Sequence, residues 1–379
     1  MNERIKEMSN RYFITAFSGM AQGLFVTLIA GTIVKTAVLQ LEKLDFFAGS
    51  VADTALMEIA ILAQLLMGAG IGVGIAYALG HSKLLVFVAA PVGLIGAEAG
   101  SFFGPEISGT FEFEGSLLTA LSFPGNPIGA YIVTLIVVEI VGLYAGKTSL
   151  DIVLTPLGAL LLAAPAVYIS YPVIWFVNKL SFWLADATNA APLIMGIIVA
   201  VSVGLLLTMP TSSAAAWVAV SMPVLGAGAA ASQEQIDAML LAGGAAAVGC
   251  AAQMVGFAVS SYRENKWGGV IAQGLGTSML QIPNILRKPI IIVPMTISSA
   301  ILGALSTTIF KINVGPGGGG MGTSGLVGVI DAFEHTSGTL GQVGIILLMI
   351  VLPAILSLAM SEWMRKMGWI KFGDMKLPE

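Results

Sequence analysis

One uncharged stretch decides the fold: residues 192–225 read PLIMGIIVAVSVGLLLTMPTSSAAAWVAVSMPVL. A helix needs about 20 consecutive apolar residues to cross the hydrocarbon core of a bilayer. This stretch is long enough for such a helix, and the polar residues 211–213 interrupt it directly after Pro210. It therefore predicts helices that span a membrane.

Comparable uncharged stretches recur along the whole chain. They lie between residues 11 and 35, 58 and 81, 151 and 179, 237 and 263, 288 and 311, and 334 and 362. Shorter apolar pieces cover residues 84–104, 128–146 and 268–286. We predict an all-α integral membrane protein with about ten transmembrane helices.

The composition agrees with this class. Only 10% of the residues are charged and the mean hydropathy is +0.92, whereas an ordinary soluble domain is about 25% charged. The formal net charge of −4 gives nucleic acid no electrostatic attraction. One cysteine and two histidines predict neither an internal disulfide nor a His-rich metal site. We expect no cofactor, no metal and no catalytic residue.

Basic residues cluster at both ends of the chain, which predicts its orientation. Loops rich in Lys and Arg stay on the cytoplasmic side of a membrane. We expect residues 1–11 and 369–379 to be cytoplasmic segments, because they contain or adjoin Arg4, Lys6, Arg11, Arg365, Lys366, Lys371 and Lys376.

The two halves of the chain resemble one another, which predicts repeats over residues 12–186 and 190–368. Pro124-Gly-Asn126 precedes Glu139 at the same spacing at which Pro316-Gly-Gly318 precedes Asp331. Many transporters are built from two repeats around a site near the middle of the membrane. The repeats can be parallel or inverted, and the sequence leaves this open.

Four segments rich in Gly or Pro interrupt the apolar pattern, at residues 122–129, 209–217, 281–289 and 314–325. Consecutive glycines do not hold a helix. Irregular backbone at membrane depth is tolerated where it is buried in protein or lines a cavity. We therefore predict broken or re-entrant segments that bind a polar substrate through Asn126, Thr211, Ser212, Asn284, Gly317, Gly318 and Gly319.

Ionisable residues are rare in this chain, so those near apolar stretches are candidates for function. Asp331, Glu334 and His335 follow the glycine-rich segment, and residues three or four apart share a helix face. Two carboxylates beside an imidazole can bind hydroxyl groups, hold a cation or relay protons. We predict that these three bind substrate, and that Asp331, Glu139 and Glu98 are possible coupling carboxylates.

The motifs of the second half resemble those of a known family. They are PTSSAAAW (210–217), AAAVGCAAQMVGFAVSSYRENKWG (245–268), QIPNILRKPIIIVPMTISSAILGALSTTIF (281–310) and VGPGGGGMGTSGLVGVIDAF (314–333). The chain resembles the phosphotransferase-system EIIC-like membrane proteins related to the perfringolysin regulator PfoR. This resemblance implies a homodimeric sugar permease of the bacterial cytoplasmic membrane. It also implies that a glutamate and a histidine hold the sugar, and Glu334-His335 is the only adjacent Glu-His pair in this sequence. We expect the EIIA and EIIB phosphocarriers to be separate polypeptides.

Two other functions fit the same sequence. One is a transporter of this fold that couples uptake to an ion or proton gradient through Glu139 and Asp331. The other is a membrane sensor or regulator that acts through a soluble partner.

Overall fold

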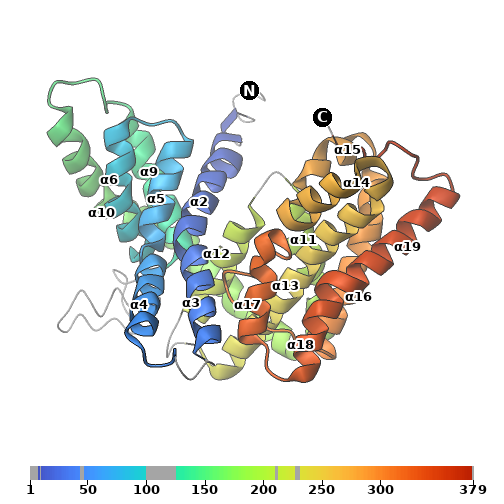
Figure 1. Cartoon of the computed structure of the whole chain (residues 1–379). Coiled ribbons are helices and arrows are strands. Elements are labelled where there is room, and N and C mark those ends of the chain that lie inside the picture. Colours follow the sequence, from blue (N-terminus) through green and yellow to red (C-terminus); the bar gives the residue numbers. More distant parts are fainter. Residues whose placement is uncertain are drawn as a thin grey trace. The chain divides into compact units, whose positions relative to one another are not determined.

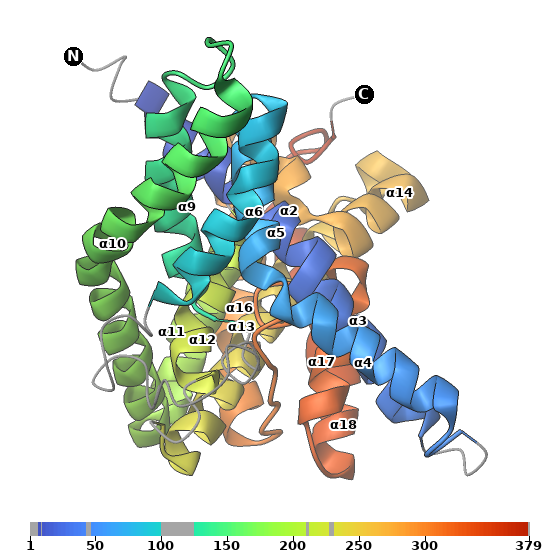
Figure 2. The ribbon, with the colours of Figure 1, turned by 90° about the vertical axis from the view of Figure 1, so that its left-hand side faces the viewer.

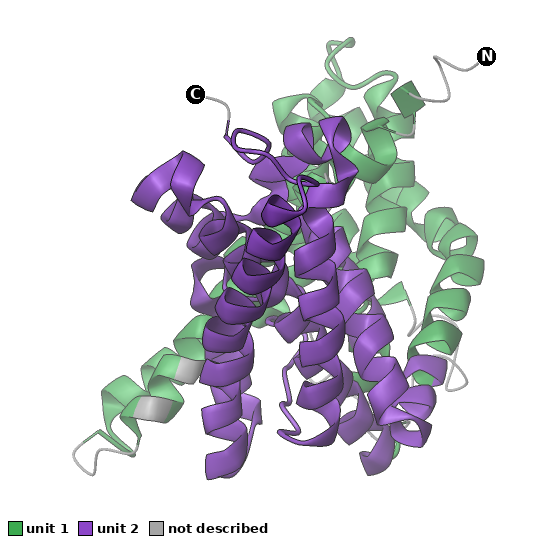
Figure 3. Ribbon diagram, turned by 90° about the vertical axis from the view of Figure 1, so that its right-hand side faces the viewer, with its two compact units in different colours: residues 1–182, 222–232 green, residues 183–221, 233–379 purple. Residues whose placement is uncertain are grey.

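A computed structural model describes residues 7–8, 10–42, 47–99, 125–209, 212–226 and 231–377, and all regular structure within these ranges is helical (Figure 1). The helices form two compact units, shown in Figure 3. Unit 1 comprises Met1–Phe182 and Met222–Ser232, and unit 2 comprises Trp183–Ser221 and Gln233–Glu379. The predicted repeat boundary at residues 186–190 lies close to the main division, and the repeats themselves stay a prediction.

Unit 1 begins with one long helical stretch of several parts, η1 (Asn10–Ala16), α2 (Phe17–Leu24), η2 (Phe25–Ile29) and α3 (Ala30–Leu41). The helices α4 (Val51–Leu65) and α5 (Met67–Ala78) follow and meet at a bend of 51°. The remaining helices of this half are α6 (Lys83–Ala97), α9 (Pro127–Gly142) and α10 (Asp151–Ala190), which belongs to unit 1 as far as Phe182.

Glycines bring the helices of unit 1 into direct backbone contact. A β-carbon on Gly23 of α2 would be closer than 3.0 Å to the backbone of Gly70 on α5. On the other side of α5, a β-carbon on Gly72 would meet the Ala89 carbonyl of α6 equally closely. Small residues at such interfaces are typical of helix packing within membranes.

The helix α10 has 40 residues, so it is about 60 Å long, twice the thickness of a hydrocarbon core. It contains Pro156, Pro165 and Pro172. Each proline removes one backbone hydrogen bond and favours a bend, and Figure 2 shows α10 as a curved helix.

Unit 2 is built around α13 (Gln233–Ser260), which α11 (Pro192–Thr208), α16 (Val293–Thr308) and α19 (Leu352–Lys366) contact. Glycines again set the spacing. A β-carbon on Gly204 of α11 would be 2.7 Å from the carbonyl oxygen of Gly249 on α13, and one on Gly196 would be 2.6 Å from that of Gly303 on α16. The helix α18 (Thr339–Ile346) and η9 (Leu347–Val351) lead directly into α19.

Short helical elements fill the rest of this half. The elements α14 (Tyr262–Ile271), η5 (Ala272–Gly276), η6 (Ser278–Gln281) and α15 (Ile282–Arg287) divide the apolar piece at residues 268–286, which therefore does not form one helix. The element η7 (Pro289–Ile292) precedes α16, and η8 (Ser324–Leu326) precedes α17 (Val327–His335). The helix α12 (Ser213–Leu225) comes after α11 in the chain and belongs to unit 2 as far as Ser221.

Five of the described helices are long and apolar enough to cross a membrane: Asn10–Leu39, Asp151–Ala190, Gln233–Ser260, Pro289–Thr308 and Thr339–Lys366. The bent pair α4–α5 qualifies as a sixth span, and four shorter apolar helices are α6, α9, α11 and α12. These helices fit the predicted membrane class, and the number of ten crossings stays a prediction.

Candidate functional site

The glycine-rich loop, residues 309–323, connects α16 to η8 without a helix. Residues 317–320 are buried within unit 2. At position 320 only glycine fits, because a β-carbon on Gly320 would be closer than 3.0 Å to the carbonyl oxygen of Ser213. The predicted binding residues Gly317, Gly318 and Gly319 therefore lie inside the protein.

Three hydrogen bonds fix the glycine-rich loop to two other elements, α12 and η5. Ser213 Oγ donates to the Gly320 carbonyl (2.7 Å), Trp217 Nε1 to the Gly315 carbonyl (3.4 Å) and Thr323 Oγ1 to the Gly274 carbonyl (2.6 Å). Ser213 and Trp217 lie in the interrupted segment 209–217. The sequence pattern drew attention to that segment, yet these two residues were missed as supports of the loop.

Asp331 and His335 form the most closely paired polar group of α17. His335 Nδ1 donates to Asp331 Oδ1 over 2.6 Å, and the backbone N–H of Gly315 donates to the same oxygen over 3.1 Å. Asp331 is 1% exposed. The imidazole and the loop thus fix the orientation of a buried carboxylate.

The second oxygen of this carboxylate, Oδ2, is buried and has no hydrogen-bond partner within the described part of the chain. It lies beside Gly318, whose β-carbon, if present, would be 2.6 Å away. Buried carboxylate oxygens are normally satisfied by a donor. Asp331 Oδ2 is therefore suited to accept a hydrogen bond from a bound molecule.

Glu334 completes a cluster with Asp331 and His335. One possible ligand atom from each of the three lies within 4.8 Å of the others. Glu334 and His335 are only half-buried. The cluster therefore offers carboxylate oxygens that can accept a hydrogen bond from a hydroxyl group, or ligand atoms for a small cation, as the spacing of these residues predicts.

Two other predicted binding residues of unit 2, Ser212 and Asn284, form hydrogen bonds within the protein, and their role in binding stays a prediction. Ser212 Oγ accepts the Ala215 N–H at the start of α12, and Thr211 lies outside the described residues. Asn284 Nδ2 donates to Gln281 Oε1 and to the Lys376 carbonyl, both over 2.8 Å.

Asn284 belongs to a buried polar network that the sequence did not reveal. Gln281 Nε2 donates to Gln273 Oε1 (2.8 Å) and to the Met375 carbonyl (2.9 Å), and Gln273 Nε2 donates to Ser261 Oγ (2.9 Å). The sequence feature that could have indicated this network is the pair Gln273 and Gln281 within the apolar piece at residues 268–286. The network holds the C-terminal segment, residues 367–377, against η6 and α15.

In unit 1, Asn126 caps α9. Its Oδ1 accepts the N–H groups of Ile128 (2.9 Å) and Gly129 (3.1 Å), and its backbone N–H donates to the Ala97 carbonyl (2.7 Å). A role in binding stays a prediction for this residue, which belongs to a different unit from Asp331.

The predicted coupling carboxylate Glu139 has a cationic partner. Arg11 contacts Glu139 Oε1 through Nε (2.8 Å) and Nη2 (2.7 Å), and His81 Nε2 lies 3.9 Å from the same oxygen. Glu98 is half-buried at the C-terminal end of α6. Whether Glu139 and Glu98 take part in coupling stays a prediction.

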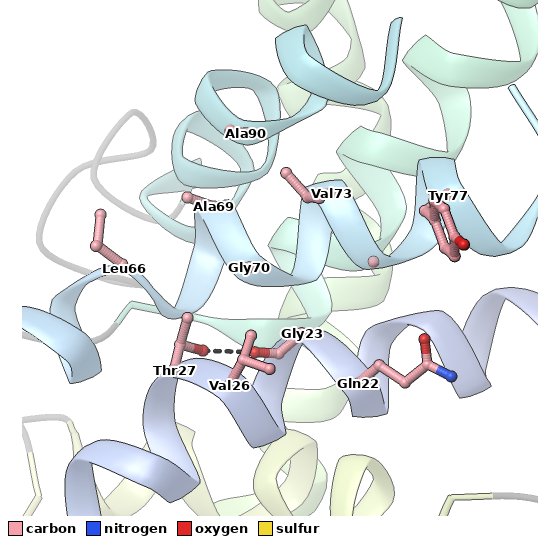
Figure 4. A pocket seen from close by; sticks show the side chains of 11 residues that line it. Gln22, Gly23, Val26, Thr27, Leu66, Ala69, Gly70, Val73, Tyr77 and Ala90 are labelled. Atoms are coloured by element: carbon pink, nitrogen blue, oxygen red, sulfur yellow. Dashed lines mark hydrogen bonds between the residues drawn. The ribbon is translucent and has the colours of Figure 1, made fainter. Parts of the chain in front are cut away.

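An open groove of about 390 Å³ lies between α2 and α5 of unit 1 (Figure 4). Its lining is mainly apolar or glycine, including Val26, Leu66, Gly70, Val73 and Tyr77. The polar side chains of the lining are Gln22, Thr27 and Tyr77, and Thr27 Oγ1 already donates to the Gly23 carbonyl (Figure 4). The groove offers little to a polar solute, so the cluster on α17 is the stronger candidate site.

A protein-family model described as "Phosphotransferase system, EIIC" matches residues 14–377 of the chain. Neither the curated proteins nor the solved structures contain a significant match. The family match covers both units, the glycine-rich loop and the cluster on α17.

Proposed function

The chain belongs to the EIIC family of the phosphotransferase system, and on this premise we propose that it is a permease whose substrate is a carbohydrate or a similar small polar solute. The family is one of membrane permeases, which agrees with the apolar helices of both units. The site that we assign to the substrate is the cluster Asp331, Glu334 and His335 with the glycine-rich loop.

The observation that carries this assignment is the buried Oδ2 of Asp331. A sugar presents several hydroxyl donors, and a carboxylate oxygen already held in place accepts one of them without further ordering. Glu334 supplies a second carboxylate at the more exposed side of the cluster. Pockets for small ligands commonly combine apolar walls with a few such fixed polar groups.

The family also supports the wider arrangement. We propose that separate EIIA and EIIB proteins phosphorylate the sugar as it is taken up, and that the permease is a homodimer in the bacterial cytoplasmic membrane with both termini inside. In this proposal His335 positions Asp331 through its Nδ1–H, while the glycines keep the backbone close to the substrate.

The test is ligand binding to the purified chain, screened with sugars and then measured by calorimetry. Asp331→Asn should weaken binding by at least about tenfold, equivalent to about 1.4 kcal/mol. The matched control is Asp237→Asn, which changes an exposed carboxylate of the same unit. Equal affinity in the two variants would remove Asp331 from the site.

The same cluster favours a second candidate, in which a cation gradient drives uptake without phosphorylation. Two carboxylates and an imidazole within 4.8 Å are a plausible set of ligands for a cation. Uptake into vesicles that depends on Na⁺ or a proton gradient, with no phosphorylated product, would favour this candidate.

A further inference from the structure

One end of unit 2 is strongly basic. We define this basic end as α14, α15, the last turn of α19 and the C-terminal segment 367–377, together with Lys288. Its cations are Arg263, Lys266, Arg287, Lys288, Arg365, Lys366, Lys371 and Lys376, and its carboxylates are Glu264, Glu362 and Asp374. Asn265 of α14 and Asn284 of α15 each donate to a carbonyl of the C-terminal segment, so these elements lie together.

Ion pairs neutralise only part of this charge. The three carboxylates pair with three of the cations: Glu264 with Arg365 (3.2 Å), Glu362 with Arg263 (3.0 Å) and Asp374 with Lys288 (2.6 Å). The exposed side chains of Lys266, Arg287, Lys366 and Lys371 form no ion pair with any residue that the structure describes. The basic end therefore presents uncompensated positive charge.

Aromatic and apolar side chains are exposed among these cations. Trp267 is 68% exposed and packs edge-on against Tyr262, with ring centroids 5.5 Å apart. Phe372 is 76% exposed and Leu286 is 78% exposed. Figure 2 shows that α14, which carries Trp267, projects sideways from the rest of unit 2.

The elements at the opposite end of unit 2 carry a different charge. The helix α13 begins with Glu234 and Asp237, and α17 ends with Glu334 and His335. Lys311 is the only Lys or Arg of the described residues between η7 and the last turn of α19. The positive charge of unit 2 is thus concentrated at one end, as expected for a cytoplasmic face.

We propose that the basic end of unit 2 is a binding surface for the headgroups of anionic phospholipids. Lys and Arg next to a membrane attract anionic lipids, and exposed tryptophans prefer the boundary between headgroups and hydrocarbon. Trp267 and Leu286 enter that boundary while Lys266 and Arg287, on the same two elements, contact phosphate. An acidic protein would match the cations but would leave these large apolar side chains at a polar surface.

This inference does not depend on the substrate. The full chain, purified in detergent, is titrated with phosphatidylglycerol or phosphatidylcholine, and bound lipid is counted by native mass spectrometry. We expect the anionic lipid to bind at least about tenfold more tightly. Added salt should weaken the binding of the anionic lipid and leave the neutral lipid unaffected.

The decisive variant combines Lys266→Gln, Arg287→Gln, Lys366→Gln and Lys371→Gln. Its matched control removes four lysines from unit 1, by Lys35→Gln, Lys83→Gln, Lys147→Gln and Lys179→Gln. The preference for anionic lipid should fall at least fivefold in the first and persist in the second. An equal preference in both variants, or none in the original protein, would overturn the proposal.

Two further measurements keep the result interpretable. Trp267→Ala alone changes an exposed side chain, and it should reduce the quenching of tryptophan fluorescence by brominated phosphatidylglycerol. If the variant with all four substitutions in the basic end keeps its lipid preference but no longer binds a purified phosphocarrier protein, the basic end is a protein-docking surface and the lipid assignment is wrong.

Discussion

The side chain of Asp331 occupies the space in which Gly318 would carry a side chain. A β-carbon on Gly318 would be 2.5 Å from the Asp331 β-carbon and 2.6 Å from Oδ2. Real β-carbons do not approach other atoms so closely. The glycine at this position is therefore a condition for the buried carboxylate.

Gly318→Ala should displace the Asp331 carboxylate and weaken ligand binding by at least about tenfold. Overpacking of this kind costs about 1–3 kcal/mol of stability, which thermal unfolding in detergent will measure. Gly268→Ala is the control, because a β-carbon there has no neighbour within 4 Å. Undisturbed binding by the Gly318 variant would show that the loop can move away from Asp331.

Asn126→Ala should lower the free energy of unfolding by about 1 kcal/mol, the usual cost of losing a helix N-cap. Asn126→Asp retains an oxygen that accepts the same two N–H groups, so its stability should stay close to that of the original protein. Chemical denaturation of both variants measures the difference. A loss of ligand affinity in both, at unchanged stability, would instead support the predicted binding role.

Asn284→Ala should destabilise the protein by about 1–3 kcal/mol, because Gln281 Oε1 and the Lys376 carbonyl each lose a buried donor. Hydrogen exchange should rise in the C-terminal segment before it rises in α13. Ser212→Ala serves for comparison, since its hydroxyl accepts a single N–H at a helix start. Slow exchange in the C-terminal segment of the Asn284 variant would contradict this role.

The stability should depend on pH through His81, which lies between α5 and α6. Burial lowers the pKa of His81 below 6.5, the Glu139 carboxylate opposes this, and the Arg11 charge adds to it. The unfolded chain thus binds the proton more readily. The free energy of unfolding should fall as the pH drops below about 6.5 toward the lower folded pKa.

Denaturation between about pH 8 and pH 5 will measure this dependence. His81→Gln cannot take up a proton and should flatten the curve over that range. The same slope in the variant would assign the effect to another group.

Local spacing was enough to predict some of these features. Asp331, Glu334 and His335 come together because a helix places residues three and four apart on one face. The run of glycines likewise indicated an irregular loop, since no helix tolerates it. The apolar stretches indicated helices, as their composition requires.

Other features depend on partners far along the chain. Asn284 contacts the Lys376 carbonyl, which lies 92 positions away, and Glu139 pairs with Arg11 across 128 positions. The spacing of residue types along the sequence does not indicate such long-range contacts. The apolar piece at residues 268–286 also looked suited to a helix, but Thr277 takes an extended conformation (φ −160°, ψ 142°) and divides it.

The glycine contacts of unit 2 limit how this half of the protein can move. Gly204 packs against Gly249, and Gly196 packs against Gly303, so that the helix backbones are in direct contact. Because such close packing leaves no free space, α11 cannot easily slide or rotate against α13 and α16. These three helices act as a fixed frame. We therefore expect a path to Asp331 to open by movement of the glycine-rich loop, which Thr323 joins to η5.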